Sequence, residues 1–518
     1  MDHHHALVSG GAFNVEAEMK NLSGKKVLVL GLGYSGLALA RWCARSGASV
    51  IVADSRALPP QLATIRAELP QVVFVNAALD HALFESTEFD MVLKSPGLSP
   101  ASLSALVGAA AARGTAVGNE LSLFSQVLLE LKAERGYAPE VIGITGTNGK
   151  TTVTALTTQL IERAGKTVAM AGNIGPTLLD TLASHLDASS LPDAWVLELS
   201  SFQLDGVDTF EPTVATLLNI SQDHLDWHET HAAYVASKAN VFGKSGVLLL
   251  NRDDPQVMGA KPVDVKAKPQ RKYVTFGIDA PQRPGDYGID TSSGMSWLVR
   301  AAELDESIKL KRGNKGEAAE LFIQRLMPLD ALRISGLHNA ANALAALALA
   351  TEAGCAMAPL LHGLREYRGE PHRVQSVGIV DDIEYFDDSK GTNVGATVAA
   401  VTGLGVNRKL VLILGGIGKG QDFSPLIEPA ARYARAVIFL GRDAPLIRVA
   451  LAELSIVMVD AVSMEHAVSL AAEHALPGDA VLMSPACASF DMFENYEQRA
   501  HAFCEAVRAL AADCGVAL

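Results

Sequence analysis

The sequence predicts an α/β protein of three domains, each built on a parallel sheet. Short apolar strands recur along all 518 residues, and each is followed by a glycine-rich turn and then an Ala/Leu-rich segment of helical length. Domains of roughly 100 to 200 residues also give about three for this length. We expect their boundaries at 1–118, 119–369 and 370–518.

The first block has a glycine loop of the dinucleotide-binding type. We expect its strands at 27–30, 49–53, 72–75 and 90–94. Gly31-Leu-Gly-Tyr-Ser-Gly36 follows the first strand, and Asp54 ends the second. Such glycines let the backbone approach a pyrophosphate, and the acid can bind a ribose hydroxyl. The block is therefore Rossmann-like, and its loop indicates a nucleotide diphosphate more than NAD in particular. A purely structural turn is the alternative.

A second phosphate loop opens the central block, whose strands we expect at 141–144, 167–171, 194–199, 213–218 and 247–250. In Gly146-Thr-Asn-Gly-Lys-Thr151 the backbone would hold phosphates, Lys150 would reach the β and γ oxygens, and the Thr151 hydroxyl would suit Mg²⁺. The first glycine of a strict P-loop is displaced, because Ile144 stands where it belongs. The pattern still predicts a P-loop ATPase-type sheet, against a helix start without nucleotide.

Two polar residues follow later strands of the same block. Glu198 ends one strand, and His224 lies in a loop after another, so both are expected at the ligand-binding edge of the sheet. A carboxylate there can bind Mg²⁺. The alternatives are a carboxylate that caps a turn and a solvated loop histidine.

The segment from about 260 to 330 lacks the strand-helix rhythm and predicts an irregular or small-β insertion. An Ala/Leu-rich helix at 338–350 is expected to close the central block, and Gly369-Glu-Pro371 would suit a linker.

The third block, which we also expect to be Rossmann-like, has strands predicted at 409–414, 436–440 and 479–483. The turns 387–393 and 415–420 place Lys390 and Lys419 where an anionic substrate could bind, although such residues also favour ordinary turns. Ser484–Asp491 is expected to open a helix, with Ser489 donating to a carboxylate. Cys487 is better explained as a buried thiol than as a nucleophile.

Composition narrows the class of protein. A net charge of −14 disfavours nucleic-acid binding through diffuse positive charge. Five scattered cysteines without a CxxC pair favour a reducing compartment, and no apolar run approaches the ~18 residues of a spanning helix. We therefore expect a cytoplasmic protein without membrane insertion, and we interpret His3–His5 as a tag remnant or solvated tail.

The motifs together resemble the Mur ligases of bacterial peptidoglycan synthesis over nearly the whole chain. Gly146–Thr151 is common to the wider family, which includes folylpolyglutamate synthase. The stretches 197–204, 388–393 and 484–491 look like the D-glutamate-adding members, and the DNPR-type motif of the diaminopimelate-adding members is absent.

The resemblance implies an ATP-dependent ligase that joins D-glutamate to UDP-N-acetylmuramoyl-L-alanine through an acyl phosphate. It implies ATP and two Mg²⁺ ions as cofactors, CO₂ carbamylation of Lys238, and a monomer. Without the resemblance, Lys238 would be interpreted as a solvated helix lysine. The glycine loop of the first block would then receive a uridine diphosphate in place of NAD.

The resemblance also implies roles for residues of this sequence. The catalytic set is Lys150, Glu198, His224 and Lys238, and the metal set is Thr151, Glu198, His224 and Lys238. ATP-binding residues are Gly146, Thr147, Asn148, Gly149, Lys150, Thr151, Thr152, Asn339, Asn342, Arg373 and Asp388. UDP-sugar-binding residues are Tyr34, Ser35, Asp54, Ser55, Ser95, Gly97 and Asn173, and D-glutamate-binding residues are Thr392, Lys419, Ser489 and Tyr496.

Three other functions stay open at this point. Another Mur-type or folylpolyglutamate-type ligase would use a different amino acid. An NAD-dependent oxidoreductase would explain Gly31–Gly36 but not the loop at Lys150, and a nucleotide-binding regulator would bind ATP without forming a product.

Overall fold

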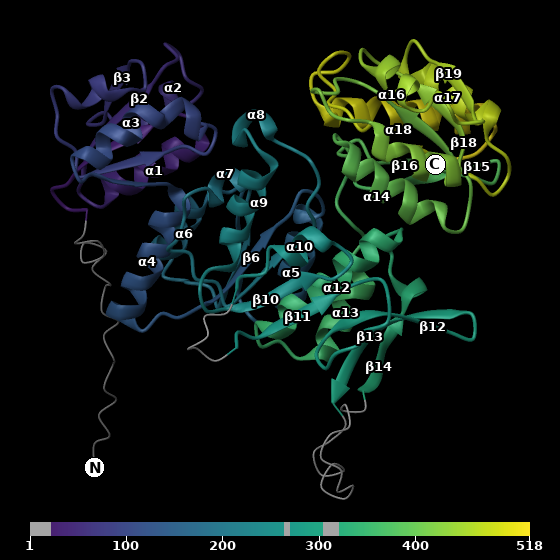
Figure 1. The fold of residues 1–518 in the computed structure, drawn as a ribbon, viewed down its shortest axis with the longest axis horizontal. Coiled ribbons are helices and arrows are strands. Elements are labelled where there is room, and N and C mark those ends of the chain that lie inside the picture. Colours follow the sequence, from purple (N-terminus) through teal and green to yellow (C-terminus); the bar gives the residue numbers. More distant parts are fainter. Residues whose placement is uncertain (1–21, 264–269, 304–320) are drawn as a thin grey trace, which may run out of the picture. The chain divides into compact units, whose positions relative to one another are not determined.

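Three β-sheets organise the chain in a computed structural model that describes residues 22–263, 270–303 and 321–518 (Figure 1). His3–His5 and parts of the predicted insertion lie outside these residues. Within them, none of the helices combines the length and the apolar character needed to cross a bilayer. By contacts the chain forms two compact units.

The first unit contains a five-stranded parallel sheet of order β3-β2-β1-β4-β5. Its strands are β1 Lys26–Leu30, β2 Ser49–Asp54, β3 Val73–Asn76, β4 Met91–Lys94 and β5 Ala116–Gly118. Its first helices are α1 Tyr34–Arg45, α2 Leu62–Glu68 and α3 Pro100–Ala112. β1 lies in the middle because it is apolar on both faces, which a parallel sheet covered by helices requires.

Two further helices belong to this unit, α4 Glu120–Arg135 and α6 Leu178–Asp187. The buried carboxylate of Glu120 accepts a hydrogen bond of 3.0 Å from the backbone N–H of Leu179, in the first turn of α6. Arg41 of α1 binds Asp180 of α6 at 3.0 Å. A carboxylate at a helix N-terminus is favourable because the first N–H groups lack partners within the helix.

The second unit contains the central sheet, of order β14-β13-β12-β11-β10-β9-β6-β8-β7. Its strands are β6 Glu140–Thr145, β7 Val168–Gly172, β8 Ala194–Glu198, β9 Val214–Leu217, β10 Val247–Asn251, β11 Tyr273–Phe276, β12 Tyr287–Ser292, β13 Met295–Glu303 and β14 Leu321–Pro328. Its helices are α5 Lys150–Arg163, α7 Ser201–Leu204, α8 Leu225–His228, α9 His231–Ala239, α10 Pro255–Gly259, α12 Leu337–Glu352 and α13 Met357–Glu366. The predicted insertion supplies the last strands of this sheet, and β12, β13 and β14 pair antiparallel.

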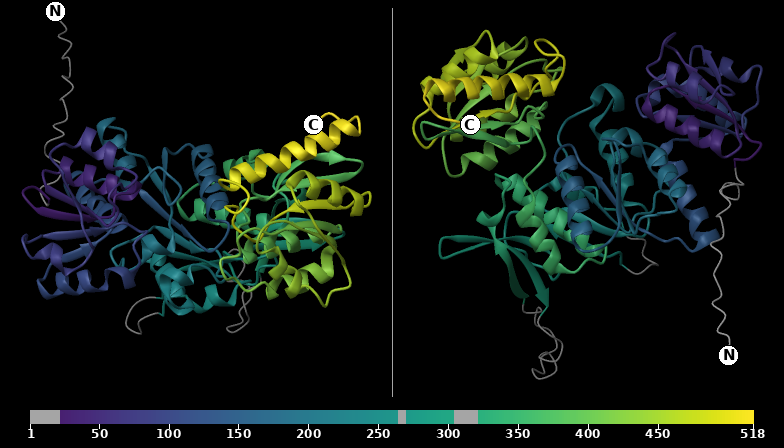
Figure 2. Two further views of the ribbon diagram at one scale, coloured as in Figure 1. Left: turned by 90° about the horizontal axis from the view of Figure 1, so that it is seen from above. Right: turned by 180° about the vertical axis from the view of Figure 1, so that it is seen from behind.

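The third sheet has the order β15-β16-β20-β17-β18-β19. Its strands are β15 Gln375–Val380, β16 Ile383–Asp387, β17 Leu410–Leu414, β18 Ala434–Phe439, β19 Val457–Asp460 and β20 Ala480–Met483. Its helices are α14 Val394–Gly405, α15 Ile427–Tyr433, α16 Ala444–Ala450, α17 Met464–His474 and α18 Tyr496–Asp513. Figure 2 shows the long helix α18 lying along this sheet, near the C-terminus. β15 is antiparallel to β16, whereas the other pairs are parallel.

The α/β class is confirmed, and every strand predicted from the sequence is present. Bounds were not predicted for β5, β15, β16 and β19, nor for β11 to β14, which lie in the segment predicted as an irregular or small-β insertion. β5 has only three residues, and β19 has the edge-strand pattern of two exposed ends. The helix predicted at 338–350 is α12.

Candidate active site

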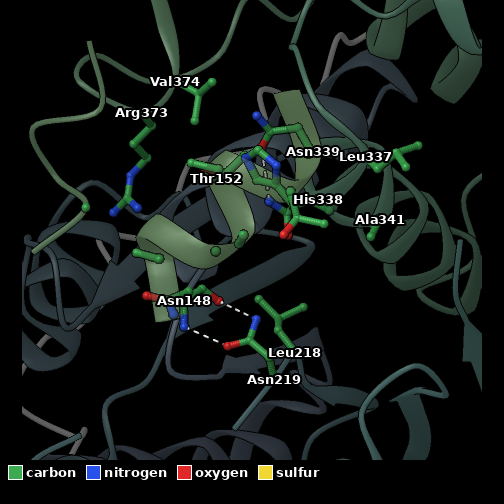
Figure 3. Close-up of a pocket in the computed structure, with 18 of the residues that line it drawn as sticks. Asn148, Thr152, Leu218, Asn219, Leu337, His338, Asn339, Ala341, Arg373 and Val374 are labelled. Carbon is green, nitrogen blue, oxygen red and sulfur yellow. Dashed lines mark hydrogen bonds between the residues drawn. The ribbon is translucent and has the colours of Figure 1, made fainter. Parts of the chain in front are cut away.

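The phosphate loop connects β6 to α5, as the sequence predicts. Gly146 and Gly149 have φ of +156° and +81°, a backbone conformation that favours glycine. The side chain of Asn219 holds the loop from the end of β9. It accepts from the N–H of Asn148 at 2.8 Å and donates to the Asn148 carbonyl at 3.0 Å (Figure 3).

Two lysines converge behind this loop. Lys150 donates from Nζ to the carbonyls of Gly146 at 2.8 Å and Thr147 at 3.0 Å. Lys238, on α9, is only 2% exposed and donates to the Gly146 carbonyl at 2.9 Å. Burial, and then the charge of Lys150, lower the pKa of Lys238 well below its ordinary value. The helix lysine that resembles a solvated residue in the sequence is therefore a buried one.

Carboxylates lie within electrostatic range of both lysines. Glu198 ends β8 and is 3% exposed. Its negative charge, like that of Asp223, acts to raise the pKa of both lysines. Burial lowers the pKa of Lys150 more than these carboxylates raise it. The half-buried Lys150 and the buried Lys238 thus have acidic neighbours, although desolvation has the largest effect on the pKa of each lysine.

His224 is held at the start of α8 with a φ of +52°. Its ring packs edge-on against Phe202 at 4.7 Å, and its Nε2 is 3.6 Å from the Asp223 carboxylate. Burial and then the nearby lysine charges lower its pKa, while Asp223 opposes them. The structure thus places His224 in the electrostatic neighbourhood of Lys150 and Lys238, where the sequence could place it only on the same sheet edge.

The donors present suit Mg²⁺ only in part. No group of three or more His, Cys, Asp or Glu side chains in the described residues converges as a preformed metal site. Mg²⁺ prefers oxygen ligands and usually keeps waters and substrate phosphates, so Glu198 and the Thr151 hydroxyl fit it. Lys238 as an ammonium opposes a cation and fits only as an anionic derivative.

Three residues that order this site were not predicted from the sequence. Tyr234 shares a hydrogen bond of 2.8 Å with the Thr147 hydroxyl, and the N–H of Ser221 donates to the same hydroxyl at 3.0 Å. Asn219 completes this support. A signal existed for Tyr234, which lies four residues before Lys238 and so on the same face of α9.

A cavity of about 280 Å³ adjoins the phosphate loop (Figure 3). Its lining brings together the predicted nucleotide-binding residues Asn148, Gly149, Thr152, Asn339, Asn342, Arg373 and Asp388. Arg373 donates to the Thr151 hydroxyl at 2.8 Å, so a residue just after the linker reaches the phosphate loop.

Asp388 is a buried acid in this lining. It accepts from the Ser484 hydroxyl at 2.6 Å and from the N–H of Val374 at 3.2 Å. Burial raises its pKa to about 7, although these donors and Arg373 oppose the rise. The carboxyl thereby fixes the backbone beside Arg373.

The residues expected to bind D-glutamate lie on loops of the third sheet. Thr392 precedes the first residue of α14 by two positions, and Lys419 is exposed with a φ of +52° in the turn after β17. Tyr496 begins α18, and the ammonium of Lys390 lies 3.7 Å from the centre of its ring. These residues frame one edge of the sheet.

The expectation that Ser484–Asp491 opens a helix is wrong. Ala488 pairs with Ile417 in an antiparallel bridge, and the next helix, α18, begins only at Tyr496. Ser489 is therefore buried in a loop and is not at a helix N-terminus. Arg499 of α18, which was not predicted from the sequence, supports this loop by donating to the Cys487 carbonyl at 3.0 Å.

The cysteines are free thiols, and the environment of Cys487 suits a structural residue. All five cysteines are free, and Cys487 is buried. Burial raises the pKa of its thiol to about 12, so it stays protonated at neutral pH. The interpretation as a buried thiol agrees with this environment.

The glycine loop of the first unit joins β1 to α1, as predicted. The Asp54 carboxylate stabilises the loop itself, accepting from the N–H of Leu32 at 2.8 Å and binding Arg56 at 2.7 Å. Hydrogen bonds from Arg56 lower the pKa of Asp54 to about 2. The hydroxyl of Ser95 donates to the Gly31 carbonyl at 3.1 Å.

The other expected UDP-sugar residues also lie in the first unit. Tyr34 is 77% exposed at the start of α1, and Ser35 follows it. Ser55 follows β2, Gly97 follows β4, and Asn173 follows β7.

The three sheets and the phosphate loop place this chain among the nucleotide-binding α/β proteins. Three family models match it: the Mur ligase MurD-like N-terminal domain at residues 25–118, the Mur ligase middle domain at 144–350, and the Mur ligase glutamate ligase domain at 372–487. The chain belongs to the Mur ligase family.

Curated relatives named UDP-N-acetylmuramoylalanine–D-glutamate ligase align along nearly the whole chain. The protein of Albidiferax ferrireducens is 60% identical over 96% of this chain and 99% of its own length. That of Ralstonia nicotianae is 53% identical over 96% of this chain and 99% of its own length.

Solved structures with the same fold are much less similar in sequence. MurF ligase from Thermotoga maritima in complex with ADP has a TM-score of 0.55 and 15% identity, covering 96% of this chain and 99% of that one. A pseudomurein peptide ligase type C from Methanothermus fervidus has a TM-score of 0.51 and 18% identity, covering 94% and 100%.

Proposed function

We propose that this protein is the ligase that joins D-glutamate to UDP-N-acetylmuramoyl-L-alanine with cleavage of ATP to ADP and phosphate, in the synthesis of peptidoglycan precursors. The observation that carries the proposal is the phosphate loop, where Lys150 and the buried Lys238 meet beside a cavity lined by Asn339, Asn342 and Arg373. Relatives at 53–60% identity bear the name of this activity.

The reaction has two steps. The substrate carboxylate attacks the γ-phosphorus of ATP, a P–O bond to ADP breaks, and an acyl phosphate forms. The amine of D-glutamate then attacks the acyl carbon, phosphate leaves, and the amine loses a proton. Both steps gather negative charge, which fixed cations in a water-poor site stabilise.

Residues of the central sheet would act on the phosphates. Lys150 would move its ammonium from the carbonyls it now contacts to the transferred phosphoryl group. The N–H groups of Gly146–Thr152 would bind the ATP phosphates, and Arg373 would add a charge beside Thr151. Asn339, Asn342 and Asp388 would contact the nucleoside from the cavity.

Two Mg²⁺ ions, when bound, would supply charge stabilisation at the phosphates. Thr151, Glu198, His224 and a carbamylated Lys238 would hold them. The buried position of Lys238 supports the modification, because a carbamate would exchange a buried cation beside Lys150 for an anion that attracts it. Its formation from the ammonium joins Nζ to the carbon of CO₂ and releases two protons.

The UDP-sugar would bind at the first sheet, and D-glutamate would bind at the third sheet. Tyr34, Ser35, Asp54, Ser55, Ser95, Gly97 and Asn173 would receive the UDP-sugar, and Thr392, Lys419, Ser489 and Tyr496 would receive D-glutamate. This assignment divides the chain into domains at 1–118, 119–369 and 370–518. We further propose a monomer in the cytoplasm, with small molecules as its substrates.

Amino-acid-dependent phosphate release tests the proposal. Purified protein with ATP, Mg²⁺ and UDP-N-acetylmuramoyl-L-alanine should release phosphate and form an amide, detected by mass, with D-glutamate only. L-glutamate, L-lysine and diaminopimelate are the comparison substrates. Release with one of these would assign another Mur-type or folylpolyglutamate-type specificity, and no release with any would overturn the proposal.

A further inference from the structure

Helix α14 approaches the phosphate loop at a glycine. A Cβ added at Gly395 would lie 2.5 Å from the Oγ and 3.1 Å from the Cβ of Ser221, and 3.2 Å from the side-chain nitrogen of Asn148. The first of these distances is shorter than any normal contact. The first turn of α14 therefore packs against the loops that follow β6 and β9 so closely that a Cβ at position 395 would require Ser221 to shift.

A second glycine makes the same kind of approach two turns later. A Cβ at Gly403 would collide with the ring of His338, at the start of α12. Between the two glycines, Ala396, Ala399 and Ala400 line the nucleotide cavity. One face of α14 thus approaches the phosphate loop at Gly395 and α12 at Gly403, with the cavity between these two points.

A pair of amides fixes the register of this contact. The side chain of Asn393 donates to the Asn148 side chain at 3.1 Å and accepts from it at 3.4 Å. The same Asn393 oxygen accepts from the N–H of Ala396 at 2.8 Å and so caps α14. Asn393 also follows Thr392 directly, which the proposed function assigns to D-glutamate.

We propose that α14 is the docking helix that positions the amino-acid-binding loop on the phosphate loop, with Asn393 as the positioning residue and Gly395 and Gly403 as its points of closest approach. The inference rests on the proposed function for the identity of the two ligands. The contact itself stands on the packing and the amide pair. Binding of nucleotide at Asn148 and of amino acid at Thr392 is then coupled through adjacent side chains.

Helix stability gives no reason for glycine at position 395. The residue lies inside α14 and does not have a positive φ. In a helix interior alanine is favoured over glycine by about 1 kcal/mol, and at this second residue of α14 it would be favoured by less. The glycine is explained by the close approach to Ser221.

The size conflict provides the test. Gly395→Ala should retain or raise the urea midpoint of unfolding. It should nevertheless raise KM for D-glutamate at least tenfold and lower kcat, because the added Cβ would keep the loop that carries Thr392 from packing against the phosphate loop. Adding Ser221→Gly should restore both constants. That second change removes only Cβ and Oγ, because Ser221 contacts Thr147 through its backbone and its Oγ has no partner among the described residues.

Gly108→Ala is the matched control. Gly108 also lies inside a helix, α3, and a Cβ there would meet nothing within 4 Å. Its kinetics should equal those of the wild type. If Gly395→Ala matches this control, or if Ser221→Gly does not rescue it, the docking role is wrong.

Asn393→Asp separates positioning from capping. Aspartate still caps α14 but cannot donate to Asn148, so stability should hold while KM for D-glutamate rises. The rate of hydrogen exchange in peptides containing 146–152 should increase in Asn393→Asp and in Gly395→Ala. It should return to the wild-type rate when Gly395→Ala is combined with Ser221→Gly. Unchanged exchange would overturn the inference. Exchange requires no turnover, so it also distinguishes this result from failure of the proposed ligase activity.

Discussion

Lys150 and Lys238 donate to the same atom, the carbonyl oxygen of Gly146, at 2.8 and 2.9 Å. Two ammonium groups that share one neutral acceptor repel each other, and this repulsion contributes to the lowered pKa of Lys238. The arrangement is favourable once anions arrive. An anion beside the pair, either a phosphate or the carbamate proposed at Lys238, would relieve this repulsion.

Replacing Lys150 by alanine should remove the charge proposed to meet the transferred phosphoryl group. We expect kcat to fall at least about a hundredfold, as for loss of one donor to a developing charge. Phosphate release measures the effect. Lys244→Ala, at an exposed lysine in the loop before β10, is the control and should leave the rate unchanged. Near-normal turnover of Lys150→Ala would exclude that lysine from the mechanism.

Lys238→Ala should be nearly inactive but folded, because the change removes a buried amine without leaving a buried charge. Acetate or formate should restore part of the activity by replacing the carbamate. In wild-type protein, ¹³C-labelled bicarbonate should give a carbamate NMR signal that Lys238→Ala lacks. Full activity without rescue would show that Lys238 has only a structural role.

Lys419→Ala should affect amino-acid binding and spare the nucleotide. Lys419 is exposed in its turn, so its loss should scarcely change stability. We expect KM for D-glutamate to rise at least tenfold, with ADP affinity unchanged by calorimetry. Lys409→Ala, at an exposed lysine directly before β17, is its control. An unchanged KM would remove Lys419 from the site.

Glu120 should make stability depend on pH. Burial, and then the charge of Asp180, raise its pKa from the ordinary 4.5 to about 7, against the effect of the N–H groups it accepts from. Between these values the unfolded chain releases the proton and the folded chain keeps it. Stability is therefore full below about pH 4.5 and falls by up to about 3 kcal/mol as pH rises to about 7.

Glu120→Gln should remove this dependence while keeping an oxygen for the N–H of Leu179. Urea midpoints at pH 5 and pH 8 should differ less in Glu120→Gln than in the wild type. Glu88→Gln, at an exposed position, should retain the wild-type difference. An equal difference in urea midpoint between pH 5 and pH 8 for all three proteins would contradict the prediction.

The sequence predicted the strands and the turns after them, because a buried parallel strand and a glycine turn are local patterns. Gly146–Thr151 and Glu198 lie where those patterns placed them. Helical periodicity could assign Lys238 to a face of α9 but could not show what covers that face. Its burial depends on the Gly146 carbonyl, 92 residues away in the chain.

The misplaced helix at Ser489 has a similar origin. Small residues after a strand commonly begin a helix, but here the bridge between Ala488 and Ile417 competes with it. The amide pair of Asn148 and Asn393 was also invisible in the sequence, since its partners are 245 residues apart. Long-range pairing decides what local propensity leaves open.

The first unit is assembled from separate stretches, 1–138, 171–192 and 205–209. During synthesis on the ribosome, α6 emerges well after the first sheet. Until then, Glu120 and Arg41 lack their partners in α6, the N–H of Leu179 and the carboxylate of Asp180. The unit that begins the chain thus cannot be completed first as an independent body. The chain therefore passes between the two units several times. A protease cut at any one of these connections would leave the units joined by the other connections.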